Sequence, residues 1–400
     1  MQGVNRYDRK IIASRNRNNS GPRLVEAVPK QHVKKIHIVG IDYTLFLSVL
    51  ILLLIGIVMV FSATYYSAIA VGADRFNYLV VQSVAATLGF VVMVVVANLN
   101  YRYIKRFVKL FYLTSIGLLF LTVAFGVGPL GARRWLTVPN TNFTFQPSEI
   151  TTLALILMVS YTISRRKNIL KTFWGHLSVF TLIAIPILLI NTSNFSAVIL
   201  LSVVGFGIMF VASPFTFPFF GVGALVAAGF AGFIYFAEDF RMDRILAWQQ
   251  PFADPSNASF QTVQSLYAIG SGGFFGLGLG QSRQKLGFLP EAHNDIIFSL
   301  IVEELGLLGG GLIIFLFAVF IWRALKIAAN AGDLFGSLVA TGIAIAIGAQ
   351  AIINIGVATN AIPNTGIQLP FISYGGTSLV ITLASVGLLL SISRYKKKLD

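Results

Sequence analysis

Long apolar runs recur along almost the whole of this 400-residue chain, and they constrain its fold more than any other feature. Residues 43–65, 107–126 and 217–236 are examples, and each run is close to the ~20 residues that a membrane-spanning helix needs. Hydrophobic residues make up 56% of the chain and charged residues only 11%, whereas a soluble domain carries roughly 25% charged residues. The chain is therefore predicted to be all-α, a polytopic integral membrane protein built as a bundle of helices.

Ten spans are predicted, so both ends of the chain should lie on the same side of the membrane. The predicted spans are residues 43–65, 78–99, 107–127, 149–164, 174–190, 195–212, 217–237, 295–321, 333–357 and 372–393. They form a membrane domain over residues 42–395, between a basic tail (1–41) that is expected to be disordered and a short basic tail (396–400). The first apolar run begins only after the long polar tail, which does not fit a cleavable signal peptide.

The basic residues indicate the orientation of this bundle. With both ends in the cytoplasm, 23 of the 30 Lys and Arg residues fall on the cytoplasmic side, as the positive-inside rule requires. Membrane topology thus accounts for the net charge of +15, and no nucleic-acid partner is expected. The seven exceptions are Arg75, Arg133, Arg134, Arg241, Arg244, Arg283 and Lys285. Six of them lie in two outer loops, 128–148 and 238–294, and a connection as long as the second is usually functional.

A glycine-rich stretch, GSGGFFGLGLG, occupies residues 270–280 of the second outer loop. It resembles a nucleotide-binding loop only superficially, because the strand-to-helix context and the glycine spacing of such a loop are missing. A flexible re-entrant or lid segment is the preferred interpretation.

Three ionisable side chains, Glu291, His293 and Asp295, stand at alternate positions immediately before the eighth predicted span. An extended backbone would direct all three to one face. Asp295 could cap the N-terminus of the helix, or act as a general base whose pKa is raised by partial desolvation, and the two roles are compatible. The three residues could also hold a divalent cation, Mg²⁺ or Mn²⁺, but no cofactor is required by the pattern. The chain has no cysteine, which excludes disulfides and zinc–thiolate sites.

Two further polar features fall at membrane depth. Glu303 and Glu304 lie about two turns inside the eighth span, where they either pair with an arginine of an outer loop or line a polar substrate groove. Residues 354–378 are rich in Gly and Pro, and non-helical backbone at this depth is stable only beside protein or a watery cavity. This segment, which includes Ser373, is therefore expected to line the groove.

Arginine and tryptophan cluster in both outer loops, as Arg133, Arg134 and Trp135 in the first and as Arg241 and Arg244 before Trp248 in the second. Arginine suits bidentate binding of phosphate oxygens, which favours an anionic lipid headgroup as ligand. Anchoring at the membrane interface is the alternative. Near the first cluster, Glu149 follows a Pro–Ser helix start, so it could be only a first-turn acid stabilised by the helix dipole.

These motifs together resemble the SEDS family (shape, elongation, division and sporulation), and most of all its FtsW and SpoVE members. The resemblance runs from about residue 42 to the C-terminus, and the joint occurrence of its motifs is very specific. The motifs are, in order, GARRWL, FQPSE, RILAW, QSLYAIGSGG, GLGLGQSRQK, LPEAHNDIIF, EELG and LPFISYGG.

The resemblance implies a ten-helix SEDS fold and a peptidoglycan glycosyltransferase of the bacterial cytoplasmic membrane, which polymerises lipid II at the outer face for septal wall synthesis. It also implies undecaprenyl-pyrophosphate-linked glycan as the second reactant, and a class B penicillin-binding protein transpeptidase and other divisome membrane proteins as partners. Asp295 matches the family's essential acid and would activate the acceptor sugar hydroxyl in an inverting displacement. The candidate substrate-binding residues are Arg133, Arg134, Trp135, Glu149, Arg241, Arg244, Lys285, Glu291, His293 and Ser373.

Two positions depart from the family pattern. The family usually has lysine where this chain has Thr152, and PDLGTA where residues 193–198 read SNFSAV. The missing cation and the missing acid are hypothesised to compensate for each other, because an unpaired charge in the membrane is costly. A lipid II flippase and a non-catalytic scaffold for a penicillin-binding protein are the alternative functions. The flippase is disfavoured because the polar, broken sequence gathers mainly on the outer side, and no repeat is evident.

Overall fold

Nine helices in the described part of the chain are long and apolar enough to cross a membrane. They are α1 (Tyr43–Ala70), α2 (Asn77–Asn98), α4 (Val108–Phe125), α5 (Pro147–Arg165), α6 (Phe173–Ile190), α7 (Phe195–Ala212), α11 (Ile297–Asn330), α12 (Leu334–Ala358) and α13 (Gly376–Arg394). The computed structural model describes residues 36–38, 40–70, 74–128, 133–137, 144–166, 168–190, 194–213, 248–253, 259–286 and 293–397. Nine of the ten predicted spans are thus confirmed, and the predicted span 217–237 lies outside the described residues.

Short elements connect these helices or flank them. They are helices α3 (Tyr101–Ile104) and α10 (Phe260–Gly272), the 3₁₀ turns η2 (Ile169–Lys171) and η3 (Gln284–Leu286), and strands β1 (Ile36–Ile38), β2 (Leu136–Thr137), β3 (Thr144–Phe145) and β4 (Tyr395–Lys397). Strand β1 pairs antiparallel with β4, and β2 pairs antiparallel with β3. Strand β1 precedes the first span and β4 follows the last. Their pairing therefore puts the start of α1 and the end of α13 on the same side of the bundle.

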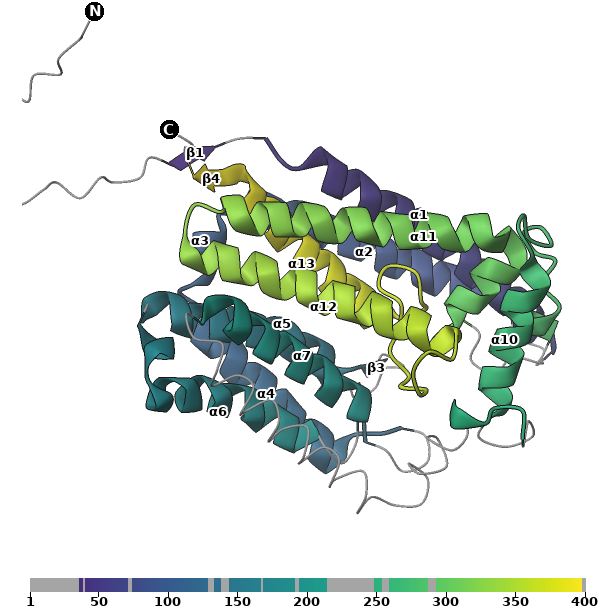
Figure 1. The fold of residues 1–400 in the computed structure, drawn as a ribbon, viewed down its shortest axis with the longest axis horizontal. Helices are drawn as coiled ribbons and strands as arrows, with labels where there is room; N and C mark the ends of the chain where they lie inside the picture. The colour runs from purple at the N-terminus through teal and green to yellow at the C-terminus, as the bar shows by residue number, and fades with distance from the viewer. Residues whose placement is uncertain are drawn as a thin grey trace, which may run out of the picture. The chain divides into compact units, whose positions relative to one another are not determined.

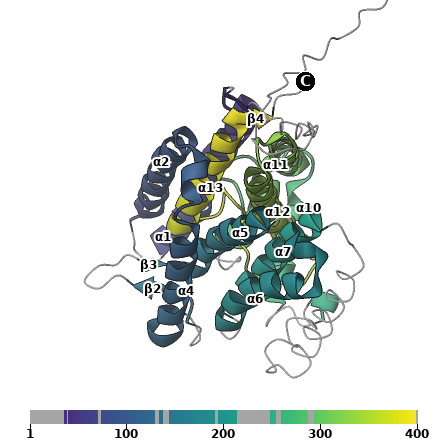
Figure 2. The same ribbon diagram turned by 90° about the vertical axis from the view of Figure 1, so that its left-hand side faces the viewer.

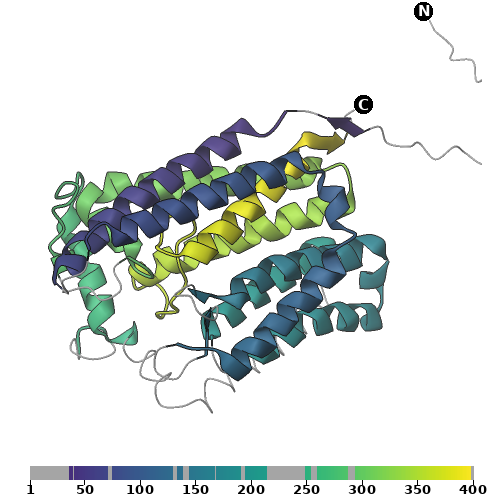
Figure 3. The same ribbon diagram turned by 180° about the vertical axis from the view of Figure 1, so that it is seen from behind.

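The long helices pack as two groups that share α12. In the first group α13 packs most extensively on α2, while α1 contacts α2 and α11 (Figure 3). In the second group α4, α5, α6 and α7 pack on one another, and both α5 and α7 also contact α12 (Figure 1). Helix α13 lies between α2 and α5 and contacts both of them (Figure 2). Helices α5, α12 and α13 therefore surround a common space at the junction of the two groups.

Small residues allow the closest approaches between these helices. A Cβ atom at Gly387 of α13 would lie 2.5 Å from the backbone oxygen of Met93 in α2. A Cβ atom at Gly56 of α1 would lie 2.4 Å from the backbone oxygen of Phe371, in the connection between α12 and α13. Small residues at helix interfaces are typical of membrane bundles, in which packing rather than the hydrophobic effect holds helices together.

Ion pairs stabilise the end of the bundle at which α1 begins and α13 ends. Nη2 of Arg323 in α11 lies 2.5 Å from Oδ2 of Asp42, and Nζ of Lys105 lies 2.7 Å from Oδ2 of Asp333. Burial acts to raise the pKa of the Asp333 carboxyl, but hydrogen bonds from Lys105 and from the N–H of Gly336 hold it below the usual value. The hydroxyl of Tyr101 also donates to Asp333, at 3.0 Å.

Helix α11 is longer than its sequence predicts. The predicted span ends at residue 321, just before Arg323, whereas the helix continues to Asn330. The predicted boundary marks only the end of the apolar run, and the following residues, Ala324 to Ala329, are good helix formers. The guanidinium group of Arg323 pairs with Asp42, at the start of α1. The helix is also interrupted at Gly306, whose φ of +71° is far from the helical value.

Candidate active site

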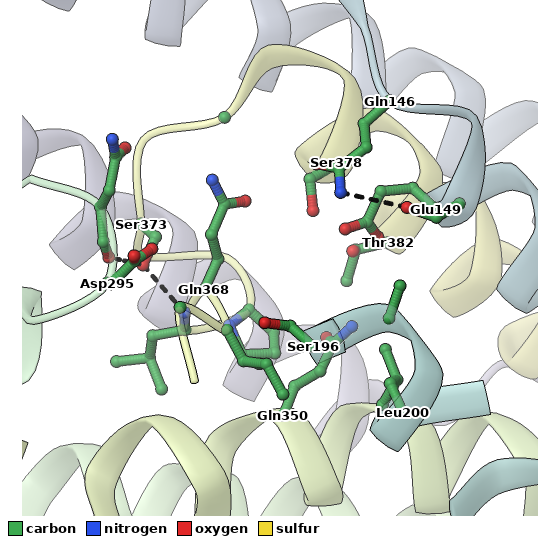
Figure 4. Close-up of a pocket in the computed structure, with 18 of the residues that line it drawn as sticks. Gln146, Glu149, Ser196, Leu200, Asp295, Gln350, Gln368, Ser373, Ser378 and Thr382 are labelled. Atoms are coloured by element: carbon green, nitrogen blue, oxygen red, sulfur yellow. Dashed lines mark hydrogen bonds between the residues drawn. The ribbon is translucent and has the colours of Figure 1, made fainter. Parts of the chain in front are cut away.

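A polar cavity of about 490 Å³ lies among α5, α7, α12 and α13 (Figure 4). It is lined by the first turns of α5 and α13, at the end of α13 opposite to β4. Its volume falls within the ~300–1,000 Å³ that is usual for small-molecule sites. Among the described residues, three charged side chains line it, Arg134, Glu149 and Asp295. The other polar lining residues are amides and hydroxyls: Gln146, Ser148, Thr152, Asn194, Ser196, Asn294, Gln350, Gln368, Ser373, Ser378 and Thr382.

Asp295 belongs to a turn, 293–296, that precedes α11 and is bound to the α12–α13 connection. Nδ2 of Asn354 donates to the backbone oxygen of Asp295 at 2.7 Å and to that of Ile367 at 2.8 Å. The hydroxyl of Ser373 donates to the backbone oxygen of Asn294 at 2.6 Å (Figure 4). The neutral side chains of Asn354 and Ser373 thus fix the backbone that carries Asp295, the candidate base. The predicted capping role of Asp295 is wrong in its register, because the N-cap position of α11 is Ile296.

Gly366 gives the Asp295 carboxylate its space in the cavity. Its φ of +69° lies in the left-handed region, and a Cβ atom built on it would lie 3.2 Å from Oδ2 of Asp295. Any other residue there would be strained and would also crowd the carboxylate.

Arg133 and Arg134 point in different directions, although the sequence suggests one cluster. Arg134 and Trp135 line the cavity. Burial lowers the pKa of the Arg134 guanidinium, while the nearby Asp295 carboxylate acts to raise it. The two groups therefore interact electrostatically. Nη1 of Arg133 instead donates to the backbone oxygens of Val123 (2.6 Å) and Ala124, in the last turn of α4. The structure therefore brings Arg134 into the site and uses Arg133 to cap a helix.

Glu149 enters the cavity from the first turn of α5, which begins at Pro147. The hydroxyl of Ser378, in the first turn of α13, donates a hydrogen bond to its carboxylate. Both interpretations made from the sequence fit this geometry, since Glu149 is a first-turn acid and also a wall residue of the cavity.

The Gly- and Pro-rich connection between α12 and α13 lines the cavity, as its sequence predicts. Gly366, Gln368 and Ser373 are among its lining residues. The amides Gln350 and Asn354 of α12, by contrast, were not singled out from the sequence. They stand four residues apart in a helix whose only other polar side chains are Ser337 and Thr341, and this spacing puts them on one helical face. Two amides on one face of a span are a usable signal for a polar cavity.

The two departures from the SEDS pattern lie in this same cavity. Thr152 lines it and donates its hydroxyl to the backbone oxygen of Ser148 at 3.0 Å. Asn194 also lines it, and its side-chain oxygen caps α7 by accepting from the N–H of Ala197 at 3.2 Å. A neutral pair thus occupies the positions at which the family would have a cation and an acid, and mutual compensation stays a hypothesis.

Other candidate residues lie away from the cavity or outside the described part. The His293 ring packs edge-on against Tyr78 and Tyr374, with ring centroids 5.4 and 5.6 Å apart, beside the turn that carries Asp295. The residues outside the described part are Arg241, Arg244 and Glu291. Among the described residues no three His, Cys, Asp or Glu side chains are grouped to hold a metal ion. Since Glu291 belongs to the predicted Mg²⁺ or Mn²⁺ set, that alternative stays a prediction.

Lys285, expected to bind substrate, belongs instead to a buried cluster away from the cavity, made of Lys285, Glu303, Glu304, Ser62 and Ser282. Nζ of Lys285 lies 3.2 Å from Oε1 of Glu304, and Ser62 donates to the same carboxylate at 2.7 Å. Glu303 accepts from the hydroxyl of Ser282 at 2.5 Å and from the backbone N–H of Arg283 at 3.0 Å. The prediction for Lys285 is therefore corrected, because its long side chain reaches a buried carboxylate that would otherwise lack a cation. The expected pairing of the two glutamates with an arginine side chain is not found in the described part of the chain: Glu304 pairs with Lys285, and Glu303 accepts from a hydroxyl and a backbone N–H.

The glycine-rich stretch packs directly against α11, and two of its glycines serve close backbone contact with that helix. A Cβ atom at Gly272 would lie 2.1 Å from the backbone oxygen of Val302, and one at Gly276 would lie 2.2 Å from that of Glu304. Gly276 also has a φ of +81°, which favours glycine.

Comparison with known proteins identifies relatives over nearly the whole chain. The FtsW/RodA/SpoVE family model, described as cell cycle protein, matches residues 43–398. The chain is 40% identical over 368 residues to stage V sporulation protein E of Bacillus subtilis (strain 168), covering 89% of this chain and 98% of that protein. It is 38% identical over 359 residues to the probable peptidoglycan glycosyltransferase FtsW of Geobacter sp. (strain M18), covering 88% and 97%.

Solved structures with the same fold agree with these matches. One comes from work described as structural coordination of polymerization and crosslinking by a peptidoglycan synthase complex; it has a TM-score of 0.73 at 25% identity and covers 88% of this chain and 98% of its own. Another is the rod shape determining protein RodA of Thermus thermophilus, with a TM-score of 0.63 at 25% identity, covering 88% and 97%.

Proposed function

Because this chain belongs to the FtsW/RodA/SpoVE family of cell cycle proteins, we propose that it is a peptidoglycan glycosyltransferase that polymerises lipid II, with Asp295 as general base. The observation that carries the proposal is the presence of Asp295 and Arg134 in one polar cavity. A base for the acceptor and a cation for the leaving group are the two functions that this transfer needs.

The chemical step follows from these two groups. The Asp295 carboxylate takes the proton of the acceptor sugar hydroxyl as its oxygen attacks the anomeric carbon of the donor. A glycosidic bond forms, the bond from the anomeric carbon to the pyrophosphate oxygen breaks, and the electron pair leaves with undecaprenyl pyrophosphate. The configuration inverts in this single displacement. Arg134 stabilises the negative charge that grows on the leaving pyrophosphate, through charge-assisted hydrogen bonds.

Helix lengths support a site at the level of the lipid headgroups. Asn354, which binds the backbone of Asp295, is about 20 residues beyond the start of α12, a rise of ~30 Å. The hydrocarbon core of a bilayer is also ~30 Å thick. Since Asp333, just before α12, lies among basic residues at the opposite end, the positive-inside rule puts that end in the cytoplasm and the cavity outside.

The same orientation implies cytoplasmic termini and an extracytoplasmic active site in a bacterial cytoplasmic membrane. A cysteine at exposed Thr144 in β3 should react with an impermeant thiol reagent from outside the cell, against a background that contains no cysteine. Labelling only after the membrane is opened would reverse the topology.

The partners follow from the proposed chemistry. Glycan polymerisation has to be joined to crosslinking, and one solved relative is described in terms of both activities in one complex. We therefore propose a class B penicillin-binding protein as transpeptidase partner, and septal wall synthesis together with other divisome membrane proteins as the setting.

Polymerisation of labelled lipid II by the purified protein tests the function directly. The assay compares wild type with Asp295→Asn, with and without the penicillin-binding protein and with and without EDTA, and Asp74→Asn serves as a control carboxylate at an exposed position outside the cavity. Glycan ladders should form with wild type and with Asp74→Asn only. Transbilayer movement of lipid II without polymer would identify a flippase, binding of the partner alone would identify a scaffold, and sensitivity to EDTA would reveal a divalent cation.

A further inference from the structure

The segment that follows α10 is inserted into the hydrogen-bond ladder of α11. Four backbone bonds join the two at 2.9–3.3 Å: from Leu277 N to Glu303 O, from Gly278 N to Glu304 O, from Leu307 N to Gly273 O and from Leu308 N to Phe274 O. In an uninterrupted helix the N–H groups of residues 307 and 308 would bond to the oxygens of residues 303 and 304. The interruption at Gly306 opens those two bonds, and residues 273–278 satisfy all four groups.

The insertion lies inside the part of α11 that crosses the membrane. Arg323 and Asp42, which pair with each other, mark the inner ends of the apolar stretches of α11 and α1. Leu308 precedes Arg323 by a rise of ~22 Å, and Glu304 precedes it by ~28 Å. Helix α1 gives the same level independently, because Ser62, which binds Glu304, lies ~30 Å beyond Asp42. A hydrocarbon core ~30 Å thick therefore ends close to this layer.

The inserted segment has one polar and one apolar side. Toward the bundle it covers the buried cluster of Glu303, Glu304 and Lys285. Away from the bundle it presents the aromatic pair Phe274 and Phe275, whose ring centroids are 5.1 Å apart, and the exposed side chains of Leu277 and Leu279. Phe275 is 77% exposed.

This apolar side continues onto the outward surface of α11. Leu307, which is 64% exposed, and Leu308 are bonded through their N–H groups to the inserted segment. Leu312 and Phe315 extend the exposed apolar surface further along the helix, in a part of the span that faces hydrocarbon. An apolar patch at this level, continuous with a lipid-facing helix, is suited to acyl chains and not to water.

We propose that residues 273–279 form an interfacial membrane element, in which Phe274, Phe275, Leu277 and Leu279 insert into the outer leaflet at the boundary between headgroups and acyl chains. Aromatic side chains are enriched at this boundary. The outer connection between the seventh and eighth predicted spans is then not wholly extracytoplasmic, because this part of it is re-entrant.

Helix α10 joins this element to the wall of the cavity. The Ser265 hydroxyl donates to the backbone oxygen of Ala358, at the end of α12, at 2.6 Å. The side-chain oxygen of Gln261 accepts from Nδ2 of Asn364 at 2.8 Å, two residues before Gly366. A membrane contact at one end of α10 and the cavity loop at its other end fix the height of the cavity relative to the lipid surface.

Spin labels on single cysteines in protein reconstituted into phosphatidylglycerol/phosphatidylethanolamine vesicles test the proposal without any enzymatic assay. Phe275→Cys and Leu279→Cys probe the element. Leu312→Cys, on the lipid-facing side of α11, and Thr144→Cys, in exposed strand β3, are the lipid and water references. Accessibility to oxygen, which partitions into the bilayer, is compared with accessibility to a neutral nickel chelate, which stays in water.

The ratio of oxygen to nickel accessibility at residues 275 and 279 should be shifted from the Thr144 value toward the Leu312 value. A ratio equal to that of Thr144 at both positions would show a water-exposed loop and overturn the proposal. Shielding from both reagents in vesicles that contain this protein alone would overturn it too, because it would mean that protein covers the patch. Two labelled positions guard against a local disturbance by one substitution.

Discussion

Two sets of carboxylates lie near the N-terminal end of α11, and their surroundings differ. Glu304 is fully buried, and its two oxygens accept from Ser62, from Lys285 and from the N–H of Gly280. Asp295, just before the helix, lines a cavity of about 490 Å³, and its backbone oxygen accepts a hydrogen bond from Asn354. One site fills the space around the carboxylate with donors of the protein, while the other leaves space for a ligand. The surroundings of a carboxylate at membrane depth, and not the depth itself, therefore decide whether it is structural or available to a ligand.

The filled site and the open site should also respond differently to substitution. In the Lys285–Glu304 pair, removal of one partner leaves a buried charge without compensation, so the cost appears in stability. In the cavity, removal of a charge alters the contacts with substrate, so the cost appears in turnover or affinity. Four substitutions test this distinction.

Asp295→Asn should have the largest effect. The amide keeps the size of the side chain but cannot accept a proton, so turnover of lipid II should fall by ~10²–10⁴-fold. Folding and membrane insertion should be unchanged, and glycan synthesis is measured at equal protein level with partner binding verified. Near wild-type turnover would remove the distinction between the two sites and make Glu291 the next candidate base.

Lys285→Met should destabilise the protein by about 3–5 kcal/mol, because Glu304 then remains buried without a cation. The free energy of unfolding in detergent is the measurement. The double variant Lys285→Met/Glu304→Gln removes both charges and should recover most of the loss. If the single variant is as stable as wild type, the pair is not the structural element that the filled site requires.

Arg134→Ala should weaken lipid II binding ten-fold or more, since each charge-assisted hydrogen bond contributes about 1.5–3 kcal/mol. Arg133→Ala is the matched control, because its guanidinium group caps α4 outside the cavity. Its effect should appear in stability, with affinity close to wild type. Equal losses of affinity in both variants would mean that the two arginines bind substrate together.

Gly366→Ala should give the smallest effect, about 1–2 kcal/mol of strain from a left-handed conformation. The added methyl group also approaches Asp295, so turnover should fall several-fold while affinity changes little. Gly311→Ala is the control, because a Cβ atom there meets nothing within 4 Å. A Gly366→Ala enzyme with normal turnover would show that the carboxylate does not need the space that glycine leaves.

Local sequence predicts the helices well but not the long-range pairing of charges. Apolar runs identify the spans, since each run alone reports its burial in lipid. The pairing of Arg323 with Asp42, by contrast, connects residues 281 positions apart, and nothing near Arg323 identifies Asp42 as its partner. The same holds for Lys285, whose partner Glu304 was predicted to pair with an arginine.

Within the site, family motifs identified Asp295, whereas local geometry separated its neighbours. Arg133 and Arg134 are adjacent in an extended segment, and successive side chains of such a segment point to opposite sides. That rule could have assigned only one of them to the cavity. The dependence of Asp295 on Asn354 and Gly366 could not be predicted, because it arises from contacts across three separate segments of the chain.

The packing of α13 on α2 has a consequence for biosynthesis. Ribosomes deliver the chain from its N-terminus, so α2 enters the membrane long before its most extensive neighbour exists. Helix α13 also supplies Ser378 and Thr382 to the cavity wall. The cavity of a nascent chain is therefore incomplete until α13 has been inserted. A translation product that ends before α13 lacks part of the cavity wall and should be inactive.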